Sequence, residues 1–90
     1  MPEVFMYATS WCPFCDRAKH FLRARGLVWI EVDIEAEPAR RDEMVERSGR
    51  RTVPQIWIGD RHVGGFDDLA ALAQAGELDA LLGGGDERVG

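Results

Sequence analysis

The sequence lacks the features that mark membrane, secreted and nucleic-acid-binding proteins. No apolar run approaches the length needed to cross a bilayer. The N-terminus has no basic segment followed by an apolar stretch, so no secretory signal is expected and we predict a cytoplasmic protein. With a formal net charge of −5 and arginines gathered only as the pairs Arg40-Arg41 and Arg50-Arg51, the chain also has no basic patch for nucleic acid.

The chain is too short for more than one domain. Its 90 residues can form one modest hydrophobic core. We predict a domain over residues 1–82 and a flexible C-terminal tail over residues 83–90, because three consecutive glycines and a polar end follow the last helical pattern. A chain of this size is expected to be a monomer.

Cysteine is scarce, and the two cysteines present stand close together as Cys12-Pro13-Phe14-Cys15. A disulfide across so small a loop would restrict the unfolded chain very little. A zinc site would need two more ligands, and the histidines, His20 and His62, lack the usual zinc spacing and are expected at the surface. A redox role is therefore favoured over structural and metal roles, and no metal site is predicted.

The cysteine motif lies where an apolar run ends and a helical pattern begins. A helix start offers unpaired backbone N–H groups and the positive end of the helix dipole, and both favour a thiolate over a thiol. Pro13 suits the first helical turn, where its missing N–H costs nothing. We therefore predict that Cys12 is an exposed nucleophile and that Cys15, one turn later, can close a disulfide with it.

Apolar patterning predicts the element order β-α-β-α-β-β-α. Residues 4–8 form an almost continuous apolar run, typical of a central strand covered on both faces, and Tyr7 is expected in the core. Residues 28–34 alternate, so a strand is expected with Val28, Ile30, Val32 and Ile34 on one face. Residues 55–58 and 61–63 flank Gly59-Asp60 and predict a hairpin.

Three helices are expected between and after these strands. The first runs from Phe14 to a stop at Gly26, and the second opens at Pro38 and ends near Gly49. Asp67 or Asp68 can cap the last one, and residues 78–82 suggest a further turn or two. A right-handed crossover makes the first two strands parallel. The predicted α/β fold is thus a four-stranded mixed sheet with helices on both faces, which Trp29 and Trp57 are expected to contact.

Two later motifs suggest a binding site. The proline of Thr52-Val53-Pro54 is either a loop stop or the site of a cis bond, and periodicity does not decide between them. The stretch Gly64-Gly65-Phe66-Asp67-Asp68 is either a simple turn with a helix cap or a site for a carboxylate and an amine. A γ-glutamyl group carries both of those charges.

The cysteine motif and these two motifs, in this order and at these separations, resemble those of bacterial dithiol glutaredoxins over about residues 2–82. The resemblance implies a thioredoxin-like fold and a glutathione-dependent thiol-disulfide oxidoreductase. It also implies that glutathione is the reducing co-substrate and that no cofactor is tightly bound. The expected partners are proteins with disulfides or glutathione adducts, with ribonucleotide reductase as one candidate.

The resemblance also implies roles for individual residues. Cys12 and Cys15 are the catalytic pair, and Pro54 is the cis proline beside them. Val53 offers its backbone to the cysteinyl part of glutathione, and Phe66 and Asp67 offer N–H groups to its γ-glutamyl carboxylate. The predicted glutathione-binding set is Trp11, Phe14, Arg51, Thr52, Val53, Pro54, Gly65, Phe66, Asp67 and Asp68, with Asp67 and Asp68 as alternatives for the amino group.

The chain departs from the family pattern at Thr9, where many glutaredoxins carry Lys or Arg three residues before the first cysteine. We hypothesise that Arg51 supplies part of the missing charge. Two alternative functions are also compatible with the cysteine motif. One is a redoxin reduced by thioredoxin reductase, but such proteins tend to lack the Gly-Gly-X-Asp-Asp stretch. The other is a dimer holding a glutathione-ligated [2Fe–2S] cluster, which is commoner where Gly or Ser replaces Pro13.

Overall fold

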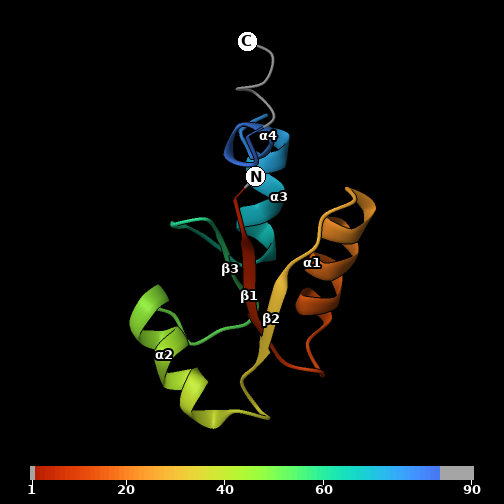
Figure 1. The fold of residues 1–90 in the computed structure, drawn as a ribbon. Coiled ribbons are helices and arrows are strands. Elements are labelled where there is room, and N and C mark those ends of the chain that lie inside the picture. The colour runs from red at the N-terminus through yellow and green to blue at the C-terminus, as the bar shows by residue number, and fades with distance from the viewer. Residues whose placement is uncertain (1, 84–90) are drawn as a thin grey trace.

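The computed structural model describes residues 2–83, which form strands and helices in the predicted order (Figure 1). None of the helices in this range has the length and apolar content to span a membrane. The predicted tail falls mostly on residues 84–90, which lie outside the described residues, so the domain boundary at residue 82 stays a prediction. The elements are β1 (Val4–Ala8), α1 (Pro13–Ala24), β2 (Ile30–Asp33), α2 (Pro38–Ser48), β3 (Gln55–Ile58), β4 (Arg61–Gly64), α3 (Phe66–Gln74) and α4 (Leu78–Leu81).

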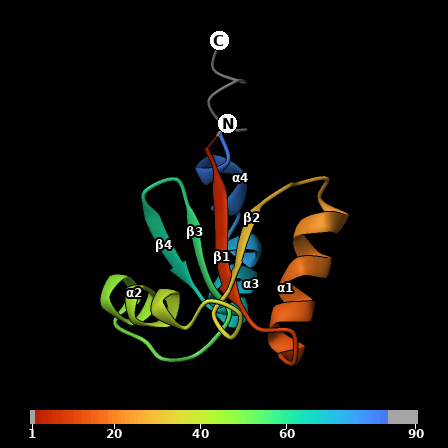
Figure 2. The same ribbon diagram turned by 60° about the horizontal axis from the view of Figure 1, so that its bottom comes forward.

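The strands form one mixed sheet in the order β2-β1-β3-β4, and Figure 2 shows them side by side with β1 and β3 at the centre. The β1–α1–β2 crossover makes β1 and β2 parallel, whereas β1 and β3 are antiparallel. The β3–β4 hairpin is antiparallel as predicted, and Gly59 takes the positive φ of 58° that its tight turn requires.

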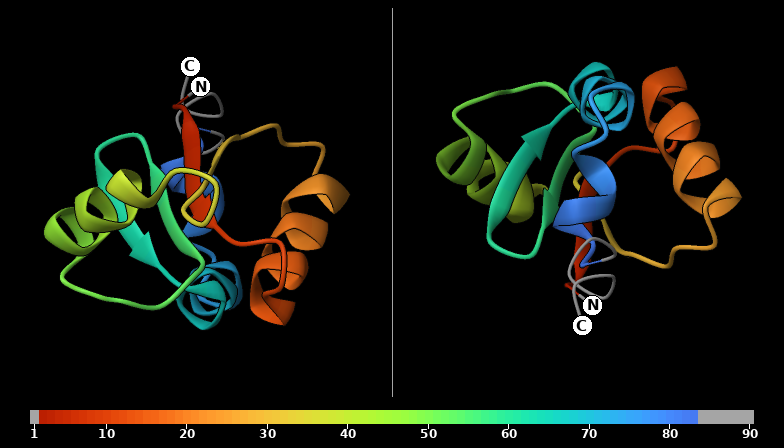
Figure 3. Two further views of the ribbon diagram at one scale, coloured as in Figure 1. Left: turned by 90° about the horizontal axis from the view of Figure 1, so that it is seen from below. Right: turned by 90° about the horizontal axis from the view of Figure 1, so that it is seen from above.

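The two faces of the sheet carry separate cores, because successive residues of β1 point to opposite sides. Val4, Met6 and Ala8 pack with α1, α3 and α4, while Phe5 and Tyr7 face α2. Figure 3 shows α2 on one side of the sheet and α1 and α3 on the other. The prediction of helices on both faces is confirmed.

The α2 face combines aromatic rings with charged groups. The guanidinium of Arg47 lies 4.3 Å from the ring centroid of Trp57, and its Nη1 donates to the Tyr7 hydroxyl at 2.9 Å. That hydroxyl in turn donates to the Glu43 carboxylate. Burial, followed by the bond to Glu43, raises the pKa of Tyr7. The predictions that Tyr7 lies in the core and that Trp57 faces a helix are confirmed.

The prediction for the second strand was partly wrong. β2 begins at Ile30, and Val28 lies outside the sheet with 86% of its surface exposed. Ile30 is also exposed, so only Val32 and Ile34 of the predicted inward face are buried. The reason is that β2 is an edge strand whose pairing with β1 starts at Ile30, leaving the residues before it without a cover. Trp29 is half-buried and stacks beneath Arg23 of α1.

The ends of the helices agree with the sequence except at α3. Gly49 follows α2 with the left-handed φ of 73° that favours glycine at this position. α3 begins at Phe66, one or two residues before the predicted cap, and its N-cap is Gly65. Asp68 still caps the helix, but from inside its first turn, because its Oδ2 accepts the Gly65 N–H at 2.8 Å.

Candidate active site

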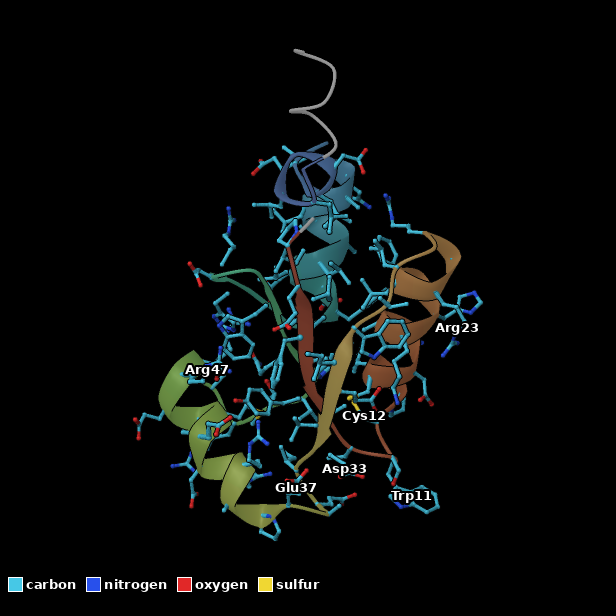
Figure 4. The ribbon with its side chains drawn as sticks, viewed as in Figure 1. Trp11, Cys12, Arg23, Asp33, Glu37 and Arg47 are labelled. Carbon is cyan, nitrogen blue, oxygen red and sulfur yellow. The ribbon has the colours of Figure 1, made fainter. Side chains whose placement is uncertain are left out.

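Cys12 is the N-cap residue of α1. Its backbone is extended, Pro13 follows as the first helical residue, and its sulfur accepts the Cys15 N–H at 3.0 Å. One N–H group of the first helical turn, which has no acceptor within the helix, therefore donates a hydrogen bond to this sulfur. Figure 4 shows the Cys12 sulfur between the sheet and the start of α1.

Cys12 is less exposed than predicted, since only 9% of its surface is accessible. The cause is the loop before β3, where the Val53 carbonyl accepts a hydrogen bond from the Cys12 Sγ at 3.4 Å. Trp11 does not cover the sulfur: it is 86% exposed and points away from the molecule (Figure 4). The Cys12 sulfur is therefore covered in part by the Val53 loop and not by the neighbouring tryptophan.

Cys15 has a different environment, although it is a free thiol like Cys12. It is fully buried on the core-facing side of α1. Burial, and then the hydrogen bond with Cys12, raise the pKa of the Cys15 thiol well above its ordinary value. A buried, protonated thiol is a poor first nucleophile. The arrangement therefore favours Cys12 over Cys15 as the first nucleophile, with Cys15 one helical turn away.

The loop that contacts Cys12 is held at the start of β3. The Val53–Pro54 peptide bond is cis, as the family resemblance implied. Just before it, the Thr52 carbonyl and hydroxyl accept hydrogen bonds from Nε2 of Gln55, at 3.0 and 3.2 Å. The loop is thus fixed on one side by a strand residue and lies against the Cys12 sulfur on the other.

A pocket of about 290 Å³ opens between this loop and the start of α3. Its walls include every residue of the predicted glutathione-binding set except Trp11 and Arg51. Arg50 takes the place expected for Arg51; the two arginines are adjacent, and nothing in the sequence distinguished them. The lining residues are Phe14, Arg50, Thr52, Val53, Pro54, Gly65, Phe66, Asp67 and Asp68.

Asp68 organises the α3 wall of the pocket. Its Oδ2 accepts hydrogen bonds from the Gly65 N–H and from Arg50 Nη1, the latter at 2.9 Å. These two bonds, in that order of importance, lower the pKa of the Asp68 carboxyl. The close approach requires glycine at position 64, where φ is 115° and a Cβ would lie 2.3 Å from Asp68 Oδ2.

The sequence did not predict the position of one residue that contacts Gln55. His62 was expected at the surface, but it is half-buried, and its Nε2 lies 2.8 Å from Oε1 of Gln55. His20 is exposed, as predicted. Across residues 2–83, no three His, Cys, Asp or Glu side chains are grouped as a metal site would require.

The comparisons with known proteins agree with this geometry. The sequence profile of the glutaredoxin family matches residues 4–63. A glutaredoxin of Pseudomonas aeruginosa is 52% identical over 82 residues, which cover 91% of this chain and 98% of the relative. The solution structure of glutaredoxin from Brucella melitensis is 52% identical, with a TM-score of 0.81 and coverage of 94% and 92%. The buckwheat glutaredoxin–glutathione complex is 25% identical, with a TM-score of 0.83 and coverage of 90% and 76%.

The fold and the paired cysteines define a thiol-disulfide oxidoreductase of thioredoxin-like architecture. The chain belongs to the glutaredoxin family. It is a glutathione-dependent dithiol glutaredoxin whose redox pair is Cys12 and Cys15. The predicted fold, activity and enzyme class are confirmed at this level.

The Asp68 contacts lead to a pH-dependent prediction. Because the folded-state pKa of Asp68 lies below its ordinary value of 3.8, its carboxylate stabilises the fold above that value and loses this effect as the pH falls through the lowered pKa. Asp68→Asn should therefore unfold at lower urea concentration than the wild type at pH 7, and this difference in midpoint should shrink as the pH falls below 3.8. A difference that stays constant over this pH range would contradict the assignment.

Proposed function

We propose that glutathione binds in the pocket between the Val53 loop and α3, with its sulfur directed at Cys12. The observation that carries this proposal is that one pocket borders both Val53, which touches the Cys12 sulfur, and the first turn of α3. A volume of about 290 Å³ is at the small end of the range for ligand sites, which suits a tripeptide. The complex of the buckwheat relative with glutathione supports the same ligand.

The α3 wall suits the γ-glutamyl end of glutathione. The N–H groups of Phe66 and Asp67 lie in the first turn of the helix, where no intrahelical acceptor reaches them, so they can receive a carboxylate. The α-amino group of glutathione is then expected to pair with the carboxylate of Asp67, whose side chain is exposed. Asp68 is less suited to it because its Oδ2 already holds Gly65 and Arg50.

The loop wall suits the cysteinyl and glycyl parts. The Val53 carbonyl accepts from the Cys12 thiol, and this bond exists only while Cys12 carries its proton. When Cys12 ionises, the carbonyl becomes available to the cysteinyl N–H of glutathione. Arg50 lines the same pocket and has guanidinium N–H groups beyond the one given to Asp68, so we assign it to the glycyl carboxylate in place of Arg51.

In the one-thiol route, the Cys12 thiolate attacks the glutathione sulfur of a protein–glutathione mixed disulfide. The protein–glutathione S–S bond breaks, the protein thiolate leaves and takes up a proton, and a Cys12–glutathione disulfide forms. A second glutathione thiolate attacks the glutathione sulfur of that adduct, which releases the Cys12 thiolate and oxidised glutathione.

In the two-thiol route, Cys12 first attacks a protein disulfide and forms a mixed disulfide with the protein. Cys15 then loses its proton and attacks the Cys12 sulfur, which releases the reduced protein and leaves a Cys12–Cys15 disulfide. Two glutathione molecules reopen this bond and leave as oxidised glutathione. The raised pKa of Cys15 makes it a poor nucleophile toward substrates in solution, whereas the Cys12 sulfur of the mixed disulfide lies one helical turn away and within its reach.

The partners implied by these routes are glutathionylated proteins and disulfide-containing proteins, of which ribonucleotide reductase is one candidate. We place the reaction in the cytoplasm, where a glutathione pool reopens the disulfide. We propose that the working unit is a monomer, the state expected for a chain of 90 residues.

The two routes predict different effects of removing each sulfur. Cys12→Ser should abolish turnover of every substrate, because a hydroxyl is a far poorer nucleophile at neutral pH. Cys15→Ser should keep the reduction of a small glutathione mixed disulfide and lose the reduction of a protein disulfide. Assays coupled to glutathione reductase measure both activities. Loss of both in Cys15→Ser would refute the division of labour.

The adjacent arginines offer a matched pair for testing the pocket. Arg50→Ala should raise KM for glutathione by about two- to fivefold, the effect of losing one partly exposed ion pair, with little change in kcat. Arg51→Ala, one residue outside the pocket, should leave KM within error of the wild type. If Arg51→Ala raises KM and Arg50→Ala does not, the earlier assignment to Arg51 is restored and this pose is wrong.

A further inference from the structure

We infer that Gln55 and His62 are positioning residues for glutathione: a hydrogen-bond chain from His62 on β4 through Gln55 on β3 holds the loop that carries Val53. This inference rests on the glutathione pose proposed above. Neither residue lines the pocket, so each would act through Thr52, whose carbonyl and hydroxyl end the chain. We refer to these three residues as the Thr52–Gln55–His62 chain.

Gln55 is the centre of the chain. It is fully buried. Its Nε2 gives its hydrogens to the Thr52 carbonyl and hydroxyl, which leaves Oε1 as an acceptor. His62 Nε2 lies 2.8 Å from this oxygen and therefore has to be the donor. The orientation of the amide and the tautomer of the imidazole thus fix one another.

The surroundings of His62 keep this donor in place. The imidazole lies against Trp57, with ring centroids 4.6 Å apart. The charged groups that act on it are Arg47 of α2, Arg50 in the loop after α2, and Asp68 of α3. Burial, and then Arg50, lower the pKa of His62, which favours the neutral ring. Because Nε2 carries a hydrogen in both the neutral tautomer and the cation, the bond to Gln55 persists through the titration.

The Val53 loop needs such a side-chain anchor. Residues 50–54 belong to no helix or strand, and Pro54 has no N–H with which to bond the sheet. The hydrogen bond from the Gln55 side chain to the Thr52 carbonyl spans Val53 and Pro54. It fixes the orientation of the peptide group between Thr52 and Val53. His62 stands two residues before Gly64, so the chain also connects this loop to the strand that leads into the α3 wall. The chain thereby fixes the distance between the two walls of the proposed glutathione pocket, the Val53 loop and the start of α3.

A purely structural role predicts a different outcome from a positioning role. If the chain only satisfies buried polar groups, breaking it should lower stability and leave glutathione kinetics unchanged. If it positions the loop, breaking it should raise KM for glutathione while kcat stays nearly constant, because the Cys12 and Cys15 sulfurs remain in place. The ratio of the two kinetic parameters therefore separates the roles.

The decisive variant is His62→Phe, which keeps a ring against Trp57 and removes the donor. We expect a rise in KM for glutathione of about three- to tenfold, the effect of roughly one lost hydrogen bond, with kcat within about twofold. His62→Gln, which restores an amide donor, should recover most of the loss. The control is Arg61→Gln, an exposed change on the same strand that should match the wild type. If His62→Phe does not fold, Gln55→Met breaks the chain at its centre with a side chain of similar length and the same expected result.

An NMR measurement separates failure of this inference from failure of the glutathione pose. The Val53 amide shift is recorded in Cys15→Ser before and after glutathione is joined to Cys12. A shift change at Val53 with a raised KM in the chain variants supports the inference. A shift change with an unaltered KM overturns the positioning role alone. No shift change at Val53 overturns the glutathione pose and the inference together.

Discussion

The hydrogen bond from the Cys15 N–H to the Cys12 sulfur is the interaction on which the site depends. It exists because Cys12 occupies the N-cap of α1, where helix geometry directs an N–H of the first turn at the side chain. Every other component of the site is arranged around the sulfur held there. The same geometry carries Cys15 into the core, so one turn of helix gives two identical residues different surroundings: Cys12 keeps 9% of its surface exposed and Cys15 keeps none.

The pocket combines elements that are distant in sequence because the sheet brings their ends together. The end of β1 leads to the cysteines, the loop before β3 covers them, and the end of β4 leads into α3. The β1–β3 and β3–β4 pairings fix these three ends relative to each other. Polar contacts complete the alignment: Asp68 links Arg50 to the start of α3, and Gln55 links Thr52 to β4.

The sequence predicted local features well and exposure poorly. The cysteine motif, Pro38, Gly49 and the Gly59 turn are set by neighbours in the chain, so their structures follow from local rules. The exposure of Cys12 and Val28 depends on loops and edges elsewhere, and both predictions failed. The choice of Arg50 over Arg51 and the burial of His62 likewise depend on partners, Asp68 and Gln55, that only the folded chain brings near.

Selective alkylation distinguishes the reactivity of the Cys12 and Cys15 sulfurs. The reduced protein is treated at neutral pH with less than one equivalent of iodoacetamide, quenched in acid, and mapped by peptide mass spectrometry. We expect the label on Cys12, with Cys15 unmodified until the protein is unfolded. Equal labelling of the two cysteines, or preferential labelling of Cys15, would contradict the assignment of Cys12 as the attacking sulfur.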